Sequence, residues 1–523
     1  MSVISEPATR VRASGPAAPA TQAAGAAQAA DRRRWIALVF IALAQLMVVL
    51  DTTIVSIALP SAQAALRISS ADRQWVITAY TLAFGGLLLV GGRIADYAGR
   101  KRAFLIGLIG FAAASAVGGA AVDPAMLIGA RAVQGAFGAL LAPTVLSMLT
   151  VTFAQPRDRA RAFAVFGAVA SGGGALGLIL GGVLTEYLSW RWCLYVNAPI
   201  AVVVAVGGAA VLPAATQASA ATQAPAATQA PAATQASAAT KTPAGRSRLD
   251  VPGAVLAAGS LLSLVLAVSG AASHGWASTL VIGLLIAAGA LLTAFVWVQN
   301  RVASPLLPLR IVLDRNRGGS YLAVAFTVAG MYGLFLFLTF YLQVVRHYSP
   351  VSAGLAFLPL SAAVLVSSTV ISARLSPWVP PRVMIVPGLV LGVAAMLVLT
   401  RLSATGGFVS QVLPAELLLG LGMGGVFATA FNTGTQRVAP RDAGVASAVV
   451  STSQQAGGSI GTALLNTVAA SATAGYLATH PHAGTVALVH GYAVAAGVAA
   501  ALLAVAVLIS AVLINAGKPE ASR

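Results

Sequence analysis

Charged residues are scarce in this sequence. Asp, Glu, Lys and Arg together make up 8% of its 523 residues, whereas a soluble domain carries about 25%. Hydrophobic residues make up 58% and gather in long runs. This composition excludes a soluble globular protein and predicts an all-α membrane protein.

Cysteine is almost absent, since Cys193 is the single one. One cysteine excludes an intrachain disulfide and a cysteine-based metal site, and no group of His, Asp and Glu has metal-site spacing. The phosphate-binding pattern G-x-x-x-x-G-K-[ST] is also missing, which argues against an ATP-driven pump. We therefore expect neither an enzyme with catalytic residues nor a bound metal or cofactor.

Fourteen apolar runs are long enough to cross a bilayer, which takes about 20 helical residues. The first six cover residues 35–59, 75–95, 103–122, 125–150, 162–184 and 191–212. After a polar insert, the other eight cover residues 251–271, 277–299, 319–342, 350–373, 383–402, 411–435, 443–470 and 487–513. The sequence thus predicts about fourteen transmembrane helices.

Positive charge predicts the orientation of these spans. If the N-terminus is cytosolic, 25 of the 31 Lys and Arg residues fall in inside segments. Arg131 falls within a span, and five residues fall outside, namely Arg67, Arg73, Arg191, Arg346 and Arg401. This asymmetry obeys the positive-inside rule and explains the net charge of +18 without a nucleic-acid partner. We expect a multi-pass protein of a bacterial-type cytoplasmic (inner) membrane, with both termini cytosolic.

Composition also divides the chain into parts. Residues 1–34 are rich in Ala, Gln and Pro and predict a disordered cytosolic tail. Residues 213–250 contain four copies of Ala-Thr-Gln-Ala-[Ser/Pro]-Ala and predict a low-complexity cytosolic linker, which tethers two bundles or binds another protein. The linker leaves six of the predicted spans before it and eight after it.

One carboxyl group lies deep in the first span, at Asp51. Burial disfavours the charged form of a carboxyl group, and a proton carrier has to gain and lose its charge easily. A structural acid, capped by hydroxyls or paired with an arginine, is the alternative. Asp51 is therefore a candidate for proton coupling or substrate binding.

The fourth span carries a guanidinium group, at Arg131. Helical spacing places Gln134, Gly135 and Gly138 on the same helix face. The glycines allow a neighbouring helix to come close, while the guanidinium needs a buried acceptor or water. Arg131 is thus a second candidate for proton coupling, with a purely structural role as the alternative.

The fifth span contains a stripe of glycines. Gly173, Gly177 and Gly181 follow one another at intervals of four, and Gly182 lies beside the last. Close helix packing explains such a stripe, and packing that also permits sliding during alternating access is the second interpretation.

The short loop after the second span contains the acid Asp96 among basic residues. The other positions of this predicted gating loop are Gly92, Arg93, Gly99, Arg100 and Lys101. The composition suits a salt bridge between helices that forms in one conformation only. The alternative is a tight turn kept inside by its basic residues.

The second half has one acid predicted within the membrane, Glu416, near the outer end of its span. It is either solvated there or serves as a site for a proton or a cation.

Four stretches of the first half together resemble the major facilitator superfamily, specifically its fourteen-span drug:proton antiporter branch (multidrug efflux type). They are Leu50–Pro60, Gly92–Arg102, Leu127–Gly138 and Trp190–Pro199, in the order and topology of that branch. The resemblance implies two six-helix bundles, at 35–212 and 319–513, plus an extra transmembrane helix pair at 251–299. It also implies Asp51 and Arg131 in proton coupling and Asp96 in conformational gating. The antiporter pattern g-x-x-x-G-P-x-x-G-G of span five is present at 173–182 with Leu178 in place of proline, so the direction of transport stays open.

We expect a secondary transporter, powered by the proton gradient and working by alternating access, that exports small lipophilic compounds. Proton-linked uptake of a small solute is the alternative, and a non-transporting receptor or scaffold is an alternative of another class. Charges within spans are costly to insert, which argues against a scaffold. Few acids in the second half favour neutral or monocationic substrates.

Overall fold

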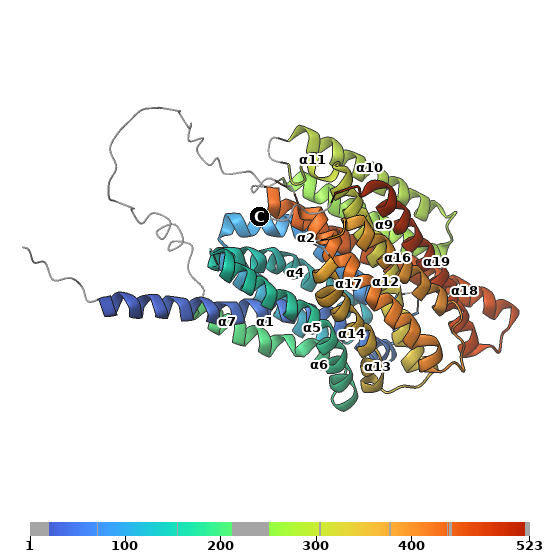
Figure 1. Ribbon diagram of the computed structural model, residues 1–523. Coiled ribbons are helices and arrows are strands. Elements are labelled where there is room, and N and C mark those ends of the chain that lie inside the picture. The colour runs from blue at the N-terminus through green and yellow to red at the C-terminus, as the bar shows by residue number, and fades with distance from the viewer. Residues whose placement is uncertain are drawn as a thin grey trace, which may run out of the picture.

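Helices are the only regular elements in the part of the chain that the structure describes. This computed structural model describes residues 20–70, 72–153, 155–211, 250–302, 305–375, 378–436, 438 and 442–517. The predicted all-α membrane fold is confirmed, with long helices running beside one another through the molecule (Figure 1).

The first half is built from α1 to α7. Their bounds are α1 Ala20–Leu66, α2 Trp75–Ala98, α3 Arg100–Gly119, α4 Pro124–Thr152, α5 Pro156–Tyr187, α6 Trp192–Tyr195 and α7 Asn197–Val211. α4 packs against α2 and α3, and α1 packs against α5 and α7. Local sequence sets the start of α4, because the Asp123 carboxylate accepts a hydrogen bond from the Met126 amide at 2.8 Å and proline follows at the first helical position.

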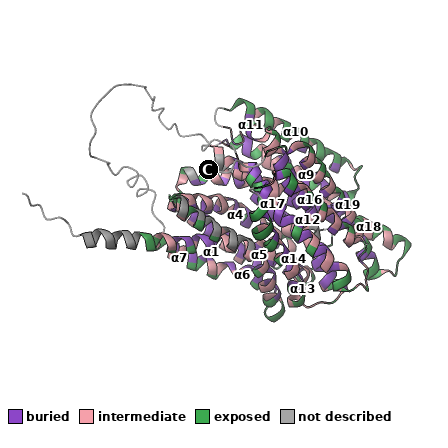
Figure 2. Cartoon of the chain, in the orientation of Figure 1, coloured by how far each residue is buried: buried purple, intermediate pink, exposed green. Residues whose placement is uncertain are grey.

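Two helices lie between the halves, α9 Val251–His274 and α10 Thr279–Arg301. α9 packs against α10, α2 and α18, so it touches both halves of the protein. Much of α10 is exposed (Figure 2). Its outer face is apolar, with Ile286 67% exposed, as suits a helix that faces lipid.

The second half is built from α11 onward. Its elements are α11 Leu309–Val312, α12 Arg315–Phe340, η1 Tyr341–Val345, α13 Pro350–Ala356, α14 Leu358–Val366, η2 Ser367–Ser372, α15 Ala373–Leu375, α16 Pro381–Leu399, η3 Phe408–Val412, α17 Leu413–Thr435, α18 Ala443–Thr479 and α19 Gly484–Leu513. α12 packs against α18 and α19, and α17 packs against α14 and α16. The elements η1, η2 and η3 are single π-helical turns, and each is continuous with an α-helix.

Eleven helical segments among the described residues are long and apolar enough to cross a membrane. The glycine-rich α5 and the Ser/Thr-rich α18 are not among them, and the apolar part of α2 is shorter, at Trp75–Leu88. All fourteen predicted ranges fall on helical segments, but the count of fourteen spans stays a prediction.

Two details differ from the sequence expectations. α1 begins at Ala20, inside the predicted disordered tail, because the alanine-rich segment before Trp35 has a high helix propensity and continues the first span. The predicted span 191–212 is divided at Val196 into α6 and α7. Residues 1–19 of the tail and 213–249 of the linker lie outside the described residues.

Candidate functional site

A buried ion pair lies at the centre of the first half. The Arg131 Nη1 atom on α4 donates to Oδ2 of Asp51 on α1 at 2.6 Å. Asp51 is 0% and Arg131 2% exposed. An ion pair so deeply buried requires further hydrogen bonds, because desolvating two charges is costly.

Two amide side chains supply further hydrogen bonds to Asp51. Gln134 on α4 donates to Asp51 Oδ1 at 2.7 Å, and Asn197 at the start of α7 donates to the same oxygen at 3.0 Å. The Asn197 amide also donates to Ser115 Oγ on α3 at 2.9 Å. The carboxylate therefore receives donors from α4 and α7, and α3 is tied to the same network.

Arg131 has partners besides the carboxylate. Its Nε donates to the Val76 carbonyl on α2 at 3.2 Å, and its Nη1 also donates to Gln134 Oε1 at 2.7 Å. The guanidinium carbon lies 4.4 Å from the ring centre of Tyr80, a cation–π distance. These contacts hold the arginine in place whether or not Asp51 carries a charge.

Glycines on α4 bring this network close to α2. A Cβ atom added at Gly135 would overlap the Tyr80 carbonyl, and one added at Gly138 would lie 2.8 Å from the Phe84 ring. The predicted helix face that carries Arg131 is confirmed, and α2 is the neighbour that it approaches.

The glycine stripe of α5 packs closely against α1. A Cβ atom at Gly173 would lie 2.9 Å from Leu46, one at Gly177 would overlap Thr53 Oγ1, and one at Gly181 would lie 3.0 Å from the Ile54 carbonyl. Gly182 instead faces the second half, where an added Cβ would lie 2.6 Å from the Pro350 carbonyl of α13. The stripe thus lies between α1 and a helix of the other half.

Leu178, the residue that departs from the antiporter pattern, lies at the same contact. It is buried, and its carbonyl meets Gly354 of α13 so closely that a Cβ there would overlap it. Near this contact, the Val351 amide donates to Glu186 at 2.9 Å. The contact between α5 and α13 is therefore built mainly from backbone and glycine.

The predicted gating loop is mostly helical. Gly92 and Arg93 lie in α2, Arg100 and Lys101 begin α3, and Gly99 is the residue between the two helices. Gly99 has a φ of +91°, which favours glycine. Arg93 donates to the Pro305 carbonyl at 3.1 Å, and Lys101 donates to the Ala209 carbonyl at the end of α7 at 2.7 Å. The side chain of Asp96 is not among those described, so its predicted salt bridge stays a prediction.

Glu416 lies on the first turn of α17 and is 0% exposed. Neither of its carboxylate oxygens receives a hydrogen bond from the described residues. The alternative of a solvated acid is therefore wrong. A position near the end of a span suggested contact with water, but the start of α17 packs against its neighbours and excludes water from the carboxyl group. Glu416 belongs to the second half, whereas the ion pair lies in the first.

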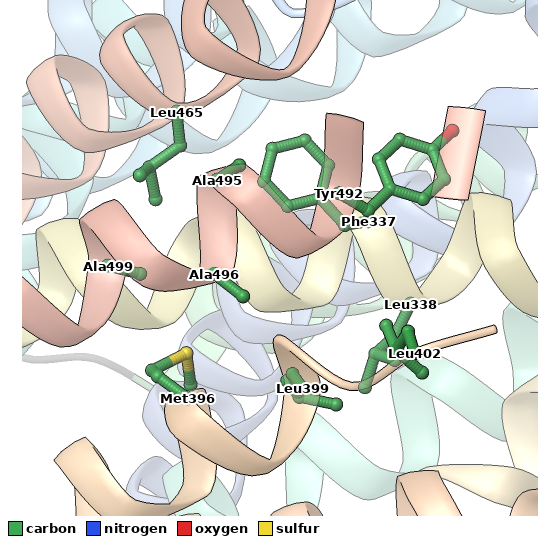
Figure 3. A pocket seen from close by; sticks show the side chains of 10 residues that line it. All are labelled: Phe337, Leu338, Met396, Leu399, Leu402, Leu465, Tyr492, Ala495, Ala496 and Ala499. Carbon is green, nitrogen blue, oxygen red and sulfur yellow. The ribbon is translucent and has the colours of Figure 1, made fainter. Parts of the chain in front are cut away.

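An apolar cavity lies in the second half (Figure 3). Its lining comes from α12, α16, α18 and α19 and from the segment that follows α16, and includes Phe337, Met396, Leu402, Leu465 and Tyr492. The rings of Phe337 and Tyr492 stack at 5.2 Å. None of the predicted site residues lines this cavity, and we read it as a gap in core packing.

Several members of the network could not be identified from sequence alone. Ser115 and Tyr80 are ordinary residues of apolar runs. Asn197 stood within the quoted stretch Trp190–Pro199, and a lone amide in an apolar span is a usable signal. No group of His, Cys, Asp and Glu in the described part of the chain could hold a metal ion.

A buried ion pair between helices, in a chain with many membrane-crossing helices, is typical of a membrane transporter. Comparison with known proteins agrees with this class. The family model described as Major Facilitator Superfamily matches residues 41–462. The chain therefore belongs to the major facilitator superfamily, and it is a multi-pass membrane transporter, not an enzyme.

Curated relatives cover most of this chain. It is 49% identical to "Puromycin resistance protein pur8" of Streptomyces alboniger over 91% of each chain. It is 41% identical to "Cephamycin export protein CmcT" of Amycolatopsis lactamdurans over 84% of this chain and 86% of that one. It is 30% identical to "Multidrug efflux pump LfrA" of Mycolicibacterium smegmatis over 83% and 81%.

Solved structures agree on the fold. A bacterial homologue of the human lysosomal transporter Spinster superposes with a TM-score of 0.61 at 15% identity, covering 92% of this chain and 97% of that one. A peptide transporter in complex with sulfate gives the same TM-score at 14% identity, covering 92% and 96%.

Proposed function

We propose that this protein exports small amphipathic compounds across the cytoplasmic membrane in exchange for protons, with Asp51 as the residue that carries the proton. The observation that carries this proposal is the ion pair between Asp51 and Arg131, which is buried and joins α1 to α4. The names of the relatives, which include a resistance protein, an export protein and an efflux pump, support export.

Protonation of Asp51 changes the balance of forces at the pair. The neutral acid no longer attracts the guanidinium, whereas Arg131 keeps Val76, Gln134 and Tyr80 as partners. Protonation therefore leaves the Arg131 charge without a counter-ion, and these three neutral partners offset part of that cost, which is otherwise several kcal/mol. In this proposal the protonated and deprotonated states favour different positions of α1 relative to α4.

The glycine stripe and the loop between α2 and α3 would be the moving contacts. Gly177 and Gly181 hold α5 close to α1, and Gly182 meets α13 of the other half. Backbone-to-backbone contacts of this kind can slide with little steric cost. Asp96, with Gly92, Arg93, Gly99, Arg100 and Lys101, would gate the opposite end by a salt bridge formed in one conformation.

We assign Glu416 a second role, as a site for a proton or for the cationic group of a substrate. A carboxyl group that is buried without a hydrogen-bond partner is costly to ionise, and a bound cation would remove that cost. One such acid in the second half favours neutral or monocationic lipophilic substrates. Export of dicationic dyes as fast as monocationic ones would contradict this.

The proposal also includes the domain division and topology. It divides the chain into the tail 1–34, the bundle 35–212, the linker 213–250, the extra pair 251–299 and the bundle 319–513, with both termini in the cytosol and no cofactor besides the proton gradient. The topology is tested by asking which arginines a reagent that cannot cross the membrane reaches from outside sealed cells.

Everted membrane vesicles test the exchange directly. Vesicles acidified by respiration and monitored with a pH-sensitive dye receive puromycin, the compound in the name of a 49% identical relative, or ethidium as a lipophilic monocation. Export predicts proton release on addition to wild-type vesicles and no release with Asp51→Asn. Proton release that occurs only when the compound leaves the vesicles would favour uptake. Proton release that persists in Asp51→Asn would show that Asp51 does not couple transport to protons.

A further inference from the structure

The break between α6 and α7 places one amide side chain on the central carboxylate. Asn197 is the first residue of α7 and is 0% exposed. Its Nδ2 atom lies 3.0 Å from Asp51 Oδ1 and 2.9 Å from Ser115 Oγ. An amide has two N–H donors, so it can serve both acceptors at once.

The segment before Asn197 is fixed on two sides. Arg191 donates to the carbonyls of Gly119, the last residue of α3, and of Ala121 just beyond it, at 2.8 and 2.6 Å. Cys193 lies within hydrogen-bond distance of Thr185 on α5, at 3.3 Å. A segment tied to α3 and to α5 offers the amide little freedom to move away from Asp51.

Ser115 fixes the orientation of the amide. Its hydroxyl donates to the Leu194 carbonyl at 2.8 Å and accepts from Asn197. Because the hydroxyl proton is already used, the serine oxygen can only accept from the amide, and the N–H side of Asn197 is the side that faces Asp51.

We propose that Asn197, oriented by Ser115, is a positioning residue that sets the pH at which Asp51 releases its proton, and that the break between α6 and α7 places it there. This inference rests on the proposed function only in taking Asp51 as a group that gains and loses a proton. A hydrogen bond donated to the charged form of a carboxyl group favours that form. Arg131 and Gln134 donate from α4, whereas Asn197 donates from α7, so it makes the charge of Asp51 depend on where α7 lies.

The groups that face Asp51 set the size of the expected shift in its titration midpoint. The charged and polar groups are Arg131 and Gln134 from α4 and Asn197 from α7. Tyr80 of α2, beside Arg131, and Cys193 of α6 also lie within electrostatic range of Asp51. Asp51 has no other acid among its described partners. Loss of one amide donor from a charged acceptor should therefore move the titration by about one pH unit toward higher pH.

The test titrates Asp51 itself, without a substrate. Full-length protein in lipid nanodiscs is followed by infrared difference spectroscopy of the carboxyl C=O band while the pH is changed, and subtraction of Asp51→Asn assigns the band. Asn197→Ala should move the midpoint upward by about one pH unit, and Ser115→Ala should move it in the same direction by less. Thr144→Val, which removes a buried hydroxyl that donates to the Leu140 carbonyl on α4, is the matched control and should leave the midpoint unchanged.

A merely structural role for Asn197 would lower protein yield or thermal stability without moving the midpoint, and that result overturns the inference. A midpoint that moves to lower pH, or equally in Thr144→Val, overturns it as well. Proton release from everted vesicles is measured separately with Asp51→Asn. If release persists there while Asn197→Ala still shifts the Asp51 band, the proposed function fails and the inference stands.

Discussion

Removal of one partner from the Asp51–Arg131 pair should cost more than removal of both. Asp51→Asn keeps an acceptor oxygen for Gln134 and Asn197, but it leaves the Arg131 charge in a site that is 2% exposed. Breaking a buried pair costs about 3–5 kcal/mol. Because Arg131 retains Val76, Gln134 and Tyr80, we expect a loss near the lower value, about 3 kcal/mol.

Arg131→Met leaves the opposite charge. Asp51 then keeps the two amide donors, Gln134 and Asn197, and can take up a proton to become neutral. This limits the loss to about 2–3 kcal/mol. In the double variant Asp51→Asn/Arg131→Met neither charge remains, and the amides still have an acceptor, so we expect a total loss of about 2 kcal/mol instead of the sum of the single losses.

The single buried cysteine provides the assay. Cys193 is 0% exposed, so a thiol-reactive fluorescent dye reports unfolding as temperature rises. The double variant should lose clearly less in Tm than the two single variants lose together. If the two losses simply add, the residues do not interact in the folded protein, and the proposed pair is refuted.

Three further substitutions test other parts of the account. Gly177→Val should abolish stable expression, because its side chain would overlap Thr53. Gly174→Val is the control and should express and melt like wild type, since nothing lies within 4 Å of a Cβ added there. Equal losses in the two variants would refute the packing role of the stripe. Glu416→Gln should raise or preserve Tm, because it exchanges an unpartnered buried acid for a side chain of the same shape that cannot ionise. It should also slow ethidium efflux relative to a neutral compound, and unchanged ethidium efflux would exclude Glu416 as a cation site. Gly354→Val should slow transport more than tenfold in vesicle uptake assays because it forces α13 away from Leu178, whereas Gly475→Val, with nothing near its added Cβ, is the control and should transport normally.

The sequence predicts the helical fold well because a bilayer imposes its own rules. A buried backbone in lipid has to be helical and about 20 residues long, so apolar runs alone locate the helices. It predicts the count of spans less firmly, because α5 and α18 carry glycine, serine and threonine where a strongly apolar segment was expected. The helical form of α5 and α18 depends on packing against neighbouring helices, and the sequence of one segment alone does not show that packing.

The candidate site was predicted in part. Asp51 and Arg131 stand out in sequence because charges in spans are rare, but the sequence does not show that they touch, since they are 80 positions apart. Ser115 becomes visible as a site residue only when α3, α6 and α7 are packed together, whereas Asn197 stands out in sequence as a lone amide in an apolar span. Glu416 was predicted near a solvated end, and its complete burial depends on how η3 and α17 pack.

Counter-transport in proteoliposomes tests the central claim most directly. Purified protein is reconstituted with puromycin on both sides, and a proton gradient is then imposed. The account predicts that wild type accumulates labelled puromycin on the acidic side, and that Asp51→Asn exchanges labelled for unlabelled puromycin but accumulates none. Accumulation by Asp51→Asn equal to that of wild type would contradict the account.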